Sequence, residues 1–344
     1  MKSILVVLIV AISPWGNVAA QVSAPIAVDG AAQMDATAAP VLGFKAQLPD
    51  KCPRSDDEAK AMYVGPYKGE DSRLGPDDMA LDIYCANAYR QSRYPNGYVT
   101  IYGSSKITES DLLMSRFALT SSYGVGYAAE VEAYKKTYDI VRDFARLWTK
   151  EHGSEFPIMT GAGPGLMEAG SRGAMEAGGP SIGYTTYYEP APAGSLLPKT
   201  GNAAAAFAKY PEKGQNQIDI ITEGLIFSSV SIRETSMILH SAAIVIAPGG
   251  TGTEWEIFQI IEMMKSDQLK DVPIYIIGDK ERHWKSFEAR LDDMICRKTF
   301  RSEQVYPLIE FIASPEELVS KLGERLKPGV VWKPGANKEV KCSM

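Results

Sequence analysis

Short β-type runs alternate with long helical runs from Tyr98 onward, and this alternation is the feature that most narrows the fold. Strands separated by helices of ten or more residues are typical of a parallel sheet, because each parallel connection needs a crossover. We therefore predict an α/β fold, a doubly wound Rossmann-like parallel sheet with helices on both faces. The predicted strands are residues 98–103, 156–161, 181–187, 217–223, 242–248, 272–278 and 307–312.

Three helices have clear sequence signals. One is predicted over Met79–Arg90. In residues 128–152, apolar side chains recur at steps of three and four, which indicates an amphipathic helix that stops near Gly153. Ser314 and Pro315 are typical of an N-cap and a first helical position, so they begin the last helix.

The N-terminus has the pattern of a secretory signal. A lysine precedes the apolar run Ile4–Ile12, and small residues end at Ala20, where we predict cleavage. An uncleaved anchor is the alternative, but the run is shorter than the roughly 20 residues that span a bilayer. We expect a secreted or periplasmic protein without stable membrane insertion, with an extension over 21–94, the main domain over 95–330 and a tail over 331–344.

The charge and the cysteine content of the chain limit the kinds of partner and metal that it can bind. The 344 residues carry a formal net charge of −6 and contain no basic run, which argues against nucleic acid and anionic membranes. The four cysteines lack the spacing of a zinc site and there are only three histidines, so we expect no metal. In an oxidising compartment Cys52 and Cys85 can pair; the alternative is four unpaired thiols.

Residues 161–165 read Gly-Ala-Gly-Pro-Gly, between a predicted strand and a predicted helix. Backbone N–H groups at a helix N-terminus bind anions, and glycine lets the anion approach them. The alternative is a close-packed turn. A dinucleotide fingerprint fits poorly, since Pro164 stands inside its spacing and no acidic residue ends the next strand.

A second glycine loop, residues 248–253, follows the predicted strand 242–248 and precedes Glu256. Both loops fall at the carboxyl edge of the predicted sheet, where ligands bind in doubly wound folds. The strings GPGLMEA and PGGTGTEWE together resemble the LONELY GUY family, whose members are often labelled lysine decarboxylases. The resemblance covers roughly residues 98–325 and matches every fixed position of the second motif.

The resemblance implies an enzyme without a cofactor. Members of this family hydrolyse nucleoside 5′-monophosphates to a free base and ribose 5-phosphate. The resemblance therefore implies that this chain acts on AMP or a cytokinin-type nucleotide and forms a homodimer. The implied catalytic residues are Glu256 and Arg233. Ala162 departs from three consecutive glycines, and Glu234 replaces a lysine. The candidate substrate-binding residues are Gly249, Gly250, Thr251, Gly252, Thr253, Gly161, Gly163, Gly165, Glu168 and Ser104.

Chemistry supports the two catalytic candidates. Breaking an N-glycosidic bond builds positive charge on the ribose and negative charge on the departing base. A carboxylate can stabilise the positive charge on the ribose and activate the attacking water. A cation or an acid can stabilise the negative charge on the base. Each residue also has a structural alternative, because Thr253 with Glu256, and Ser231 with Glu234, fit capping boxes.

Other polar residues have simpler structural interpretations. Glu168 and Arg172 are spaced as an ion pair on one helix face, Ser104 as a turn serine, and His240 as a packed residue. At the level of function, the alternative is a nucleotide-binding or sensor protein of the same fold without turnover. Decarboxylation needs a Schiff-base lysine, and no lysine stands in such a setting.

Overall fold

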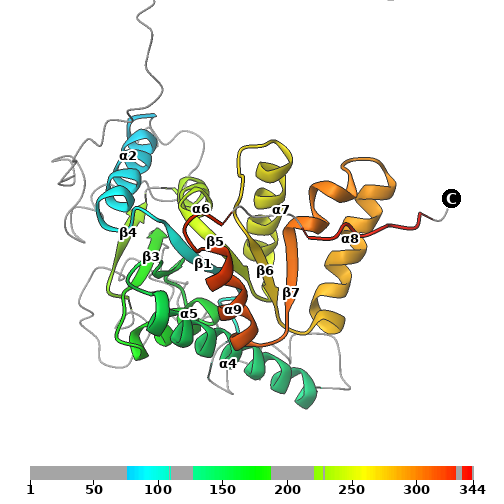
Figure 1. Ribbon diagram of the computed structural model, residues 1–344, viewed down its shortest axis with the longest axis horizontal. Helices are drawn as coiled ribbons and strands as arrows, with labels where there is room; N and C mark the ends of the chain where they lie inside the picture. The colour runs from blue at the N-terminus through cyan, green and yellow to red at the C-terminus, as the bar shows by residue number, and fades with distance from the viewer. Residues whose placement is uncertain are drawn as a thin grey trace, which may run out of the picture. The chain divides into compact units, whose positions relative to one another are not determined.

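Seven strands form one sheet in the part of the chain that the computed structural model describes, which is residues 76–107, 109, 127–186, 221–227, 229–330 and 335–342. Every neighbouring pair is parallel (Figure 1), so the predicted fold class is confirmed. The strands are β1 Tyr98–Tyr102, β2 Ile158–Thr160, β3 Ser181–Thr186, β4 Glu223–Phe227, β5 Ser241–Ile246, β6 Ile274–Ile277 and β7 Ile309–Ile312.

The strand order is β4-β3-β2-β1-β5-β6-β7. The chain moves outward from β1 to β4, then crosses back to place β5 beside β1, and continues outward in the other direction. The order therefore reverses between β1 and β5, and this switch point opens at the carboxyl ends of the two strands.

Helices cover both faces of the sheet (Figure 1). Core residues from α4, α5 and α9 pack on one face, and residues from α2, α6, α7 and α8 pack on the other. Their bounds are α2 Pro76–Arg93, α4 Tyr127–His152, α5 Leu166–Glu176, α6 Val230–Leu239, α7 Thr251–Lys265, α8 Lys285–Cys296 and α9 Pro315–Arg325; shorter turns are η2 Lys280–Trp284, η3 Ser302–Gln304 and η4 Tyr306–Leu308.

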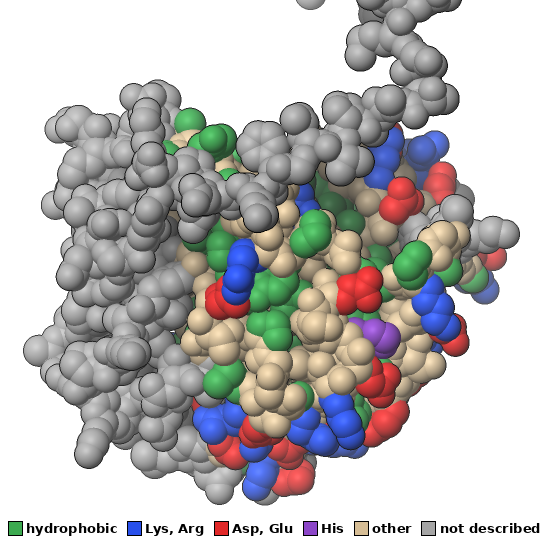
Figure 2. All heavy atoms as spheres, turned by 60° about the vertical axis from the view of Figure 1, so that its left-hand side comes forward, with side chains coloured by type: hydrophobic (Ala, Val, Ile, Leu, Met, Phe, Trp, Pro, Cys, Tyr) green, Lys and Arg blue, Asp and Glu red, His purple; other side chains and the backbone are tan. Residues whose placement is uncertain are grey.

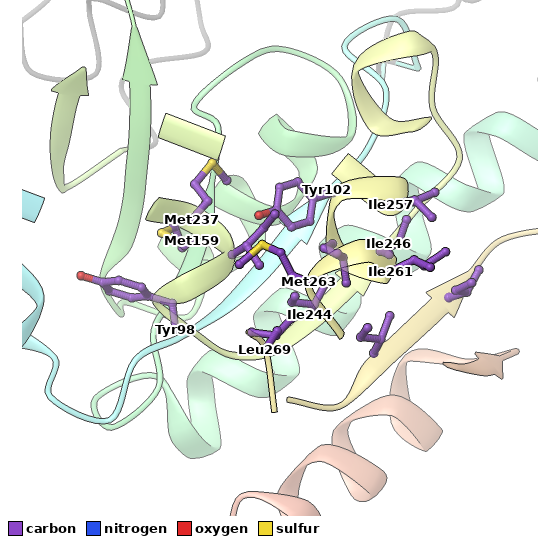
Figure 3. Close-up of a cluster of buried hydrophobic side chains, with 14 of the residues drawn as sticks. Tyr98, Tyr102, Met159, Met237, Ile244, Ile246, Ile257, Ile261, Met263 and Leu269 are labelled. Atoms are coloured by element: carbon purple, nitrogen blue, oxygen red, sulfur yellow. The ribbon is translucent and has the colours of Figure 1, made fainter. Parts of the chain in front are cut away.

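The strands divide their side chains between two cores. Val99 and Ile101 of β1 pack with α4 and α5, whereas Tyr98 and Tyr102 join the opposite core. Figure 3 shows that opposite core, where side chains of β1, β2 and β5 meet residues of α6 and α7. Burial on both faces explains why the strands read as apolar runs, as in parallel sheets generally.

The helix signals are largely confirmed. The helix predicted over residues 128–152 is α4, and Ser314 caps α9 by accepting a hydrogen bond from the Glu317 N–H at 3.2 Å. The helix expected at Met79–Arg90 extends to Pro76–Arg93 and packs beside α6.

The fourth strand is placed wrongly by the sequence. It begins at Glu223, whereas we predicted residues 217–223; of these, 217–220 lie outside the described residues. Gly224 explains the position, since a Cβ there would lie 1.9 Å from the Gly183 carbonyl oxygen. A glycine is thus needed where β4 meets β3, and tertiary packing overrides the local β propensity.

The termini are only partly described. The predicted signal and Cys52 lie outside the described residues, and no described helix is long and apolar enough to cross a membrane. The alternative of four unpaired thiols is wrong, because Cys296 at the end of α8 forms a disulfide with Cys342 in the tail.

Charged side chains of both signs are mixed on the face shown in Figure 2. They gather along its lower rim, around a middle of hydrophobic and uncharged surface. The described part of this face shows no basic stripe of the kind that follows a nucleic-acid backbone.

Candidate functional site

Backbone hydrogen bonds tie together the loops that follow β1, β2 and β5. The Ser104 N–H donates to the Pro248 carbonyl oxygen at 3.0 Å, and the Leu166 N–H donates to the Ser104 carbonyl oxygen at 2.9 Å. Ser104 follows β1 and so joins the second glycine loop to the first. The two loops predicted to bind a ligand therefore lie together at the switch point.

The first loop depends on its backbone shape. Gly165 has φ 75°, and a Cβ there would lie 2.3 Å from the Ser104 carbonyl oxygen, so only glycine fits. Ala162, which departs from the family pattern, is also left-handed at φ 54°, and its N–H donates to the Thr160 hydroxyl at 3.1 Å. The loop keeps a glycine-like conformation although alanine occupies it.

The second loop is open at its tip. A Cβ on Gly250 or Gly252 would meet no atom of the described residues within 4 Å, whereas one on Gly249 would lie 2.0 Å from the Thr253 hydroxyl oxygen. Gly250 is the N-cap of α7, which begins at Thr251. The first N–H groups of a helix lack intrahelical partners, so this open N-terminus suits an anion.

Arg233 of α6 and Glu256 of α7 meet below these loops. Both are buried, with 6% and 8% of their surface exposed, and Arg233 Nη2 lies 3.8 Å from Glu256 Oε1. The structure thus brings together the two residues predicted to be catalytic. They come from the helices that precede and follow β5 in the chain, which pack on the same face of the sheet.

Neither capping box forms. The N-caps are Gly250 for α7 and Ser229 for α6, and neither helix start has a side-chain cap. Thr253 is therefore already inside α7, and Glu256 lies further along the same helix. The capping alternatives for Glu256 and Glu234 are wrong, and helix capping does not explain why these acids are buried.

Burial dominates the electrostatics of this cluster. It raises the pKa of Glu256 to about 7, and the nearby positive charge of Arg233 opposes the rise only in part. Burial also raises the pKa of the Tyr102 hydroxyl, with a further contribution from Glu256. Within the described part of the chain, the buried Tyr102 hydroxyl, Arg233 Nε and Glu234 Oε2 have no hydrogen-bond partner. Atoms of this kind are available to a ligand or water.

The remaining predicted positions are structurally engaged. Glu168 is buried and pairs with Arg172 one turn later, as the ion-pair reading expected. The Ser104 hydroxyl accepts a hydrogen bond from the Lys106 N–H at 3.0 Å, as a turn serine does. His240 is packed, with Nδ1 3.2 Å from the Tyr184 hydroxyl oxygen, and burial lowers its pKa to about 3.

His283 is a neighbour of the second loop that sequence reasoning missed. Its Nε2 accepts a hydrogen bond from the Gly249 N–H at 3.4 Å, and burial lowers its pKa. It lies in η2, 34 residues after Gly249. No motif surrounds it, so only the fold reveals the contact.

Neither a metal-type cluster nor a cavity in the described residues points to a different site. The described residues contain no group of three His, Cys, Asp or Glu side chains placed to hold a metal ion. Cavities of about 320 and 460 Å³ lie near the C-terminal tail, the first beside β7 and the second beside the end of α8. Neither is lined by the loops or Glu256, so the site rests on loop geometry and the buried charges.

Residues 167–322 match the sequence profile of a family described as possible lysine decarboxylase. The match includes Arg233, the second glycine loop and Glu256. No match was found among the curated proteins.

Two solved structures show limited similarity. A molybdenum cofactor carrier protein from Chlamydomonas reinhardtii is 16% identical, with a TM-score of 0.38, over 67% of this chain and 98% of that one. A molybdenum cofactor binding protein from Rippkaea orientalis is 16% identical, with a TM-score of 0.34, over 55% of this chain and 86% of that one. Similarity at this level assigns no ligand.

Proposed function

We propose a specific reaction on the premise that residues 167–322 match the family described as possible lysine decarboxylase and that the two glycine loops resemble those of LONELY GUY proteins. The protein hydrolyses the N-glycosidic bond of a nucleoside 5′-monophosphate, AMP or a cytokinin-type nucleotide, and releases the base and ribose 5-phosphate. The observation that carries the proposal is the buried approach of Arg233 Nη2 to Glu256 Oε1, 3.8 Å apart beneath two glycine loops.

The second loop supplies the phosphate site. Gly250, Thr251, Gly252 and Thr253 surround the start of α7, where free N–H groups and the helix dipole favour an anion. Because the tip of the loop has open space at Gly250 and Gly252, a phosphate can approach the backbone closely. The 5′-phosphate at this position directs the ribose toward Glu256.

Glu256 and Arg233 then act on the ribose and the base. In its carboxylate form, Glu256 stabilises positive charge at C1′ and takes a proton from the attacking water. Arg233 stabilises negative charge that develops on the departing base. Burial strengthens both effects, because little water screens the charges.

Decarboxylation, the reaction in the family description, fits this site less well. It needs pyridoxal phosphate held by a Schiff-base lysine. None of the buried charged residues in the described part of the chain is a lysine. An acid and an arginine below a phosphate loop suit glycosidic cleavage better.

The direct test incubates purified protein with a panel of nucleoside monophosphates and measures released base by chromatography. We expect base and ribose 5-phosphate in equal amounts. Binding of the nucleotides without cleavage would replace the enzyme with a nucleotide sensor. If the protein neither binds nor cleaves any nucleotide of the panel, the proposal is contradicted.

We also propose that the protein is a homodimer. The apolar stretches Ile232–Ile238 and Phe258–Met264 offer little surface to a second copy, because much of them, including Met237 and Ile260, is buried in the core. The exposed apolar side chains Leu239 on α6 and Trp255 on α7 are better placed to contact a second copy. Light scattering at micromolar concentration should report a dimer, and a monomer would contradict the proposal.

Export from the cytoplasm is the third part of the proposal. Disulfides persist in oxidising compartments, and the Cys296–Cys342 bond joins α8 to the C-terminal tail. This supports the signal predicted to end at Ala20.

A further inference from the structure

Among the residues that the structure describes, the buried charges below the loops do not balance. Arg233, Glu234 and Glu256 expose 6%, 2% and 8% of their surface, so one cation is buried with two carboxyl groups. An uncompensated charge is costly in a site with little water. A proton on one of the carboxyl groups removes that cost.

The guanidinium of Arg233 is shared unequally between the two acids. Its Nη2 forms an ion pair with Glu234 Oε1, but the same nitrogen is 3.8 Å from Glu256 Oε1. On its other side, a Cβ added to Gly161 would lie 2.9 Å from Nη1, so the first loop closes over the group. Glu234 therefore takes most of the positive charge and holds its position.

We propose that Glu234 is a positioning residue, which fixes Arg233 and leaves Glu256 as the neutral acid in the resting site. The catalytic consequence rests on the proposed hydrolysis, but the protonation state does not. Arg233 of α6 faces Glu256, Tyr102 of β1 interacts with Glu256 from the sheet, and Glu234 acts on Glu256 through its ion pair with Arg233. The raised pKa of Glu256, which burial causes, agrees with this assignment.

A neutral Glu256 sets the sequence of the proton transfers, donation to the base first and recovery from water second. As the C1′–N bond breaks, its electron pair goes to the base and the Glu256 proton moves to a base nitrogen. The carboxylate left behind faces the positive ribosyl ring. Water then adds to C1′ and returns a proton to Glu256, so the acid is restored with ribose 5-phosphate as product.

Infrared spectroscopy tests the protonation state without any substrate. Wild-type protein, titrated from about pH 5 to about pH 9, should show a protonated carboxyl band with a midpoint near neutral pH that Glu256→Gln lacks. In Glu234→Gln the midpoint should fall by roughly 1 to 3 pH units, because Arg233 then pairs with Glu256. Glu262→Gln, an exposed acid on the same helix, is the matched control and should leave the band unchanged.

An ionised Glu256 throughout the titration, or an unchanged midpoint in Glu234→Gln, would overturn the inference. If Glu234→Gln does not fold, Glu234→Asp shortens the reach to Arg233 and should move the midpoint in the same direction. With an active enzyme, the alkaline limb of kcat/KM should move with the band. A uniform loss of rate without that movement would make Glu234 merely structural.

Discussion

Glu256 is an acid whose position costs stability. A carboxyl group at this depth, with its nearest cation shared with Glu234, is difficult to ionise. Residues of this kind are retained at functional sites more often than elsewhere, because catalysis uses the perturbed pKa. The cost should be measurable in the folded protein without substrate.

The first prediction concerns stability against pH. The pKa of Glu256 is about 7 in the folded protein and ordinarily about 4.5, so the folded state holds the extra proton between these values. The stability from this group is full below about pH 4.5 and is lost as pH rises through about 7. Between pH 5 and pH 8 the wild type should lose roughly 2 to 3 kcal/mol more than Glu256→Gln.

Urea unfolding at the two pH values measures the difference. Glu262→Gln removes an exposed carboxyl group from the same helix and should follow the wild type. Equal pH dependence in wild type and Glu256→Gln would show that Glu256 ionises normally.

At the scale of the elements, the second loop has one glycine that the proposed ligand needs and one that the fold needs. Gly250 is an N-cap in the extended region with open space at its Cβ, while Gly249 is packed against Thr253. The two neighbouring glycines therefore have different reasons to be glycine. A matched pair of substitutions can distinguish them.

We predict that Gly250→Val lowers the free energy of unfolding by no more than about 1 kcal/mol, the scale of a lost N-cap preference. Its side chain should fill the phosphate space and weaken nucleotide binding at least about tenfold. Gly249→Val should instead destabilise the fold by about 1 to 3 kcal/mol through overpacking. Thermal unfolding and nucleotide titration measure both; normal binding by an unstable Gly250→Val would make the loop a structural turn.

The sequence predicted most strands and the α9 cap because each depends on local patterns. Six strands lie within two residues of their predicted starts, and Ser314 caps α9 as its spacing indicated. The two capping boxes failed because the helices start earlier, at Thr251 and Val230. A helix start depends on how the preceding strand ends, and the four-residue pattern does not contain that information.

At the scale of the molecule, a disulfide fixes the C-terminal tail. Cys342 is bonded to Cys296, 46 residues away, and Lys338 pairs with Asp292 of α8 at 3.0 Å. The bond could not be read from sequence, because pairing depends on which segments meet in the fold. The burial of Glu234 with Arg233 was likewise hidden, since a charged residue in a helical run usually faces solvent.

The third prediction joins the disulfide to export. Intact-mass analysis of exported protein should find a chain that begins at Gln21 and gains mass on reduction. Cys342→Ser should lower the free energy of unfolding by up to about 4 kcal/mol, from the entropy of a loop of this length. Cys296→Ser and the double variant should show the same loss; a retained Met1 or an additive loss would contradict the prediction.

Glu256→Gln tests the catalytic assignment most directly. Because Glu256 is not a helix cap, glutamine should preserve α7 and the second loop, and nucleotide binding through the loop N–H groups should persist. Hydrolysis should fall by a factor on the order of 10² or more, since the acid and its charge are gone. Measured side by side with the wild type on the same nucleotide, cleavage at a near wild-type rate would show that Glu256 is not catalytic.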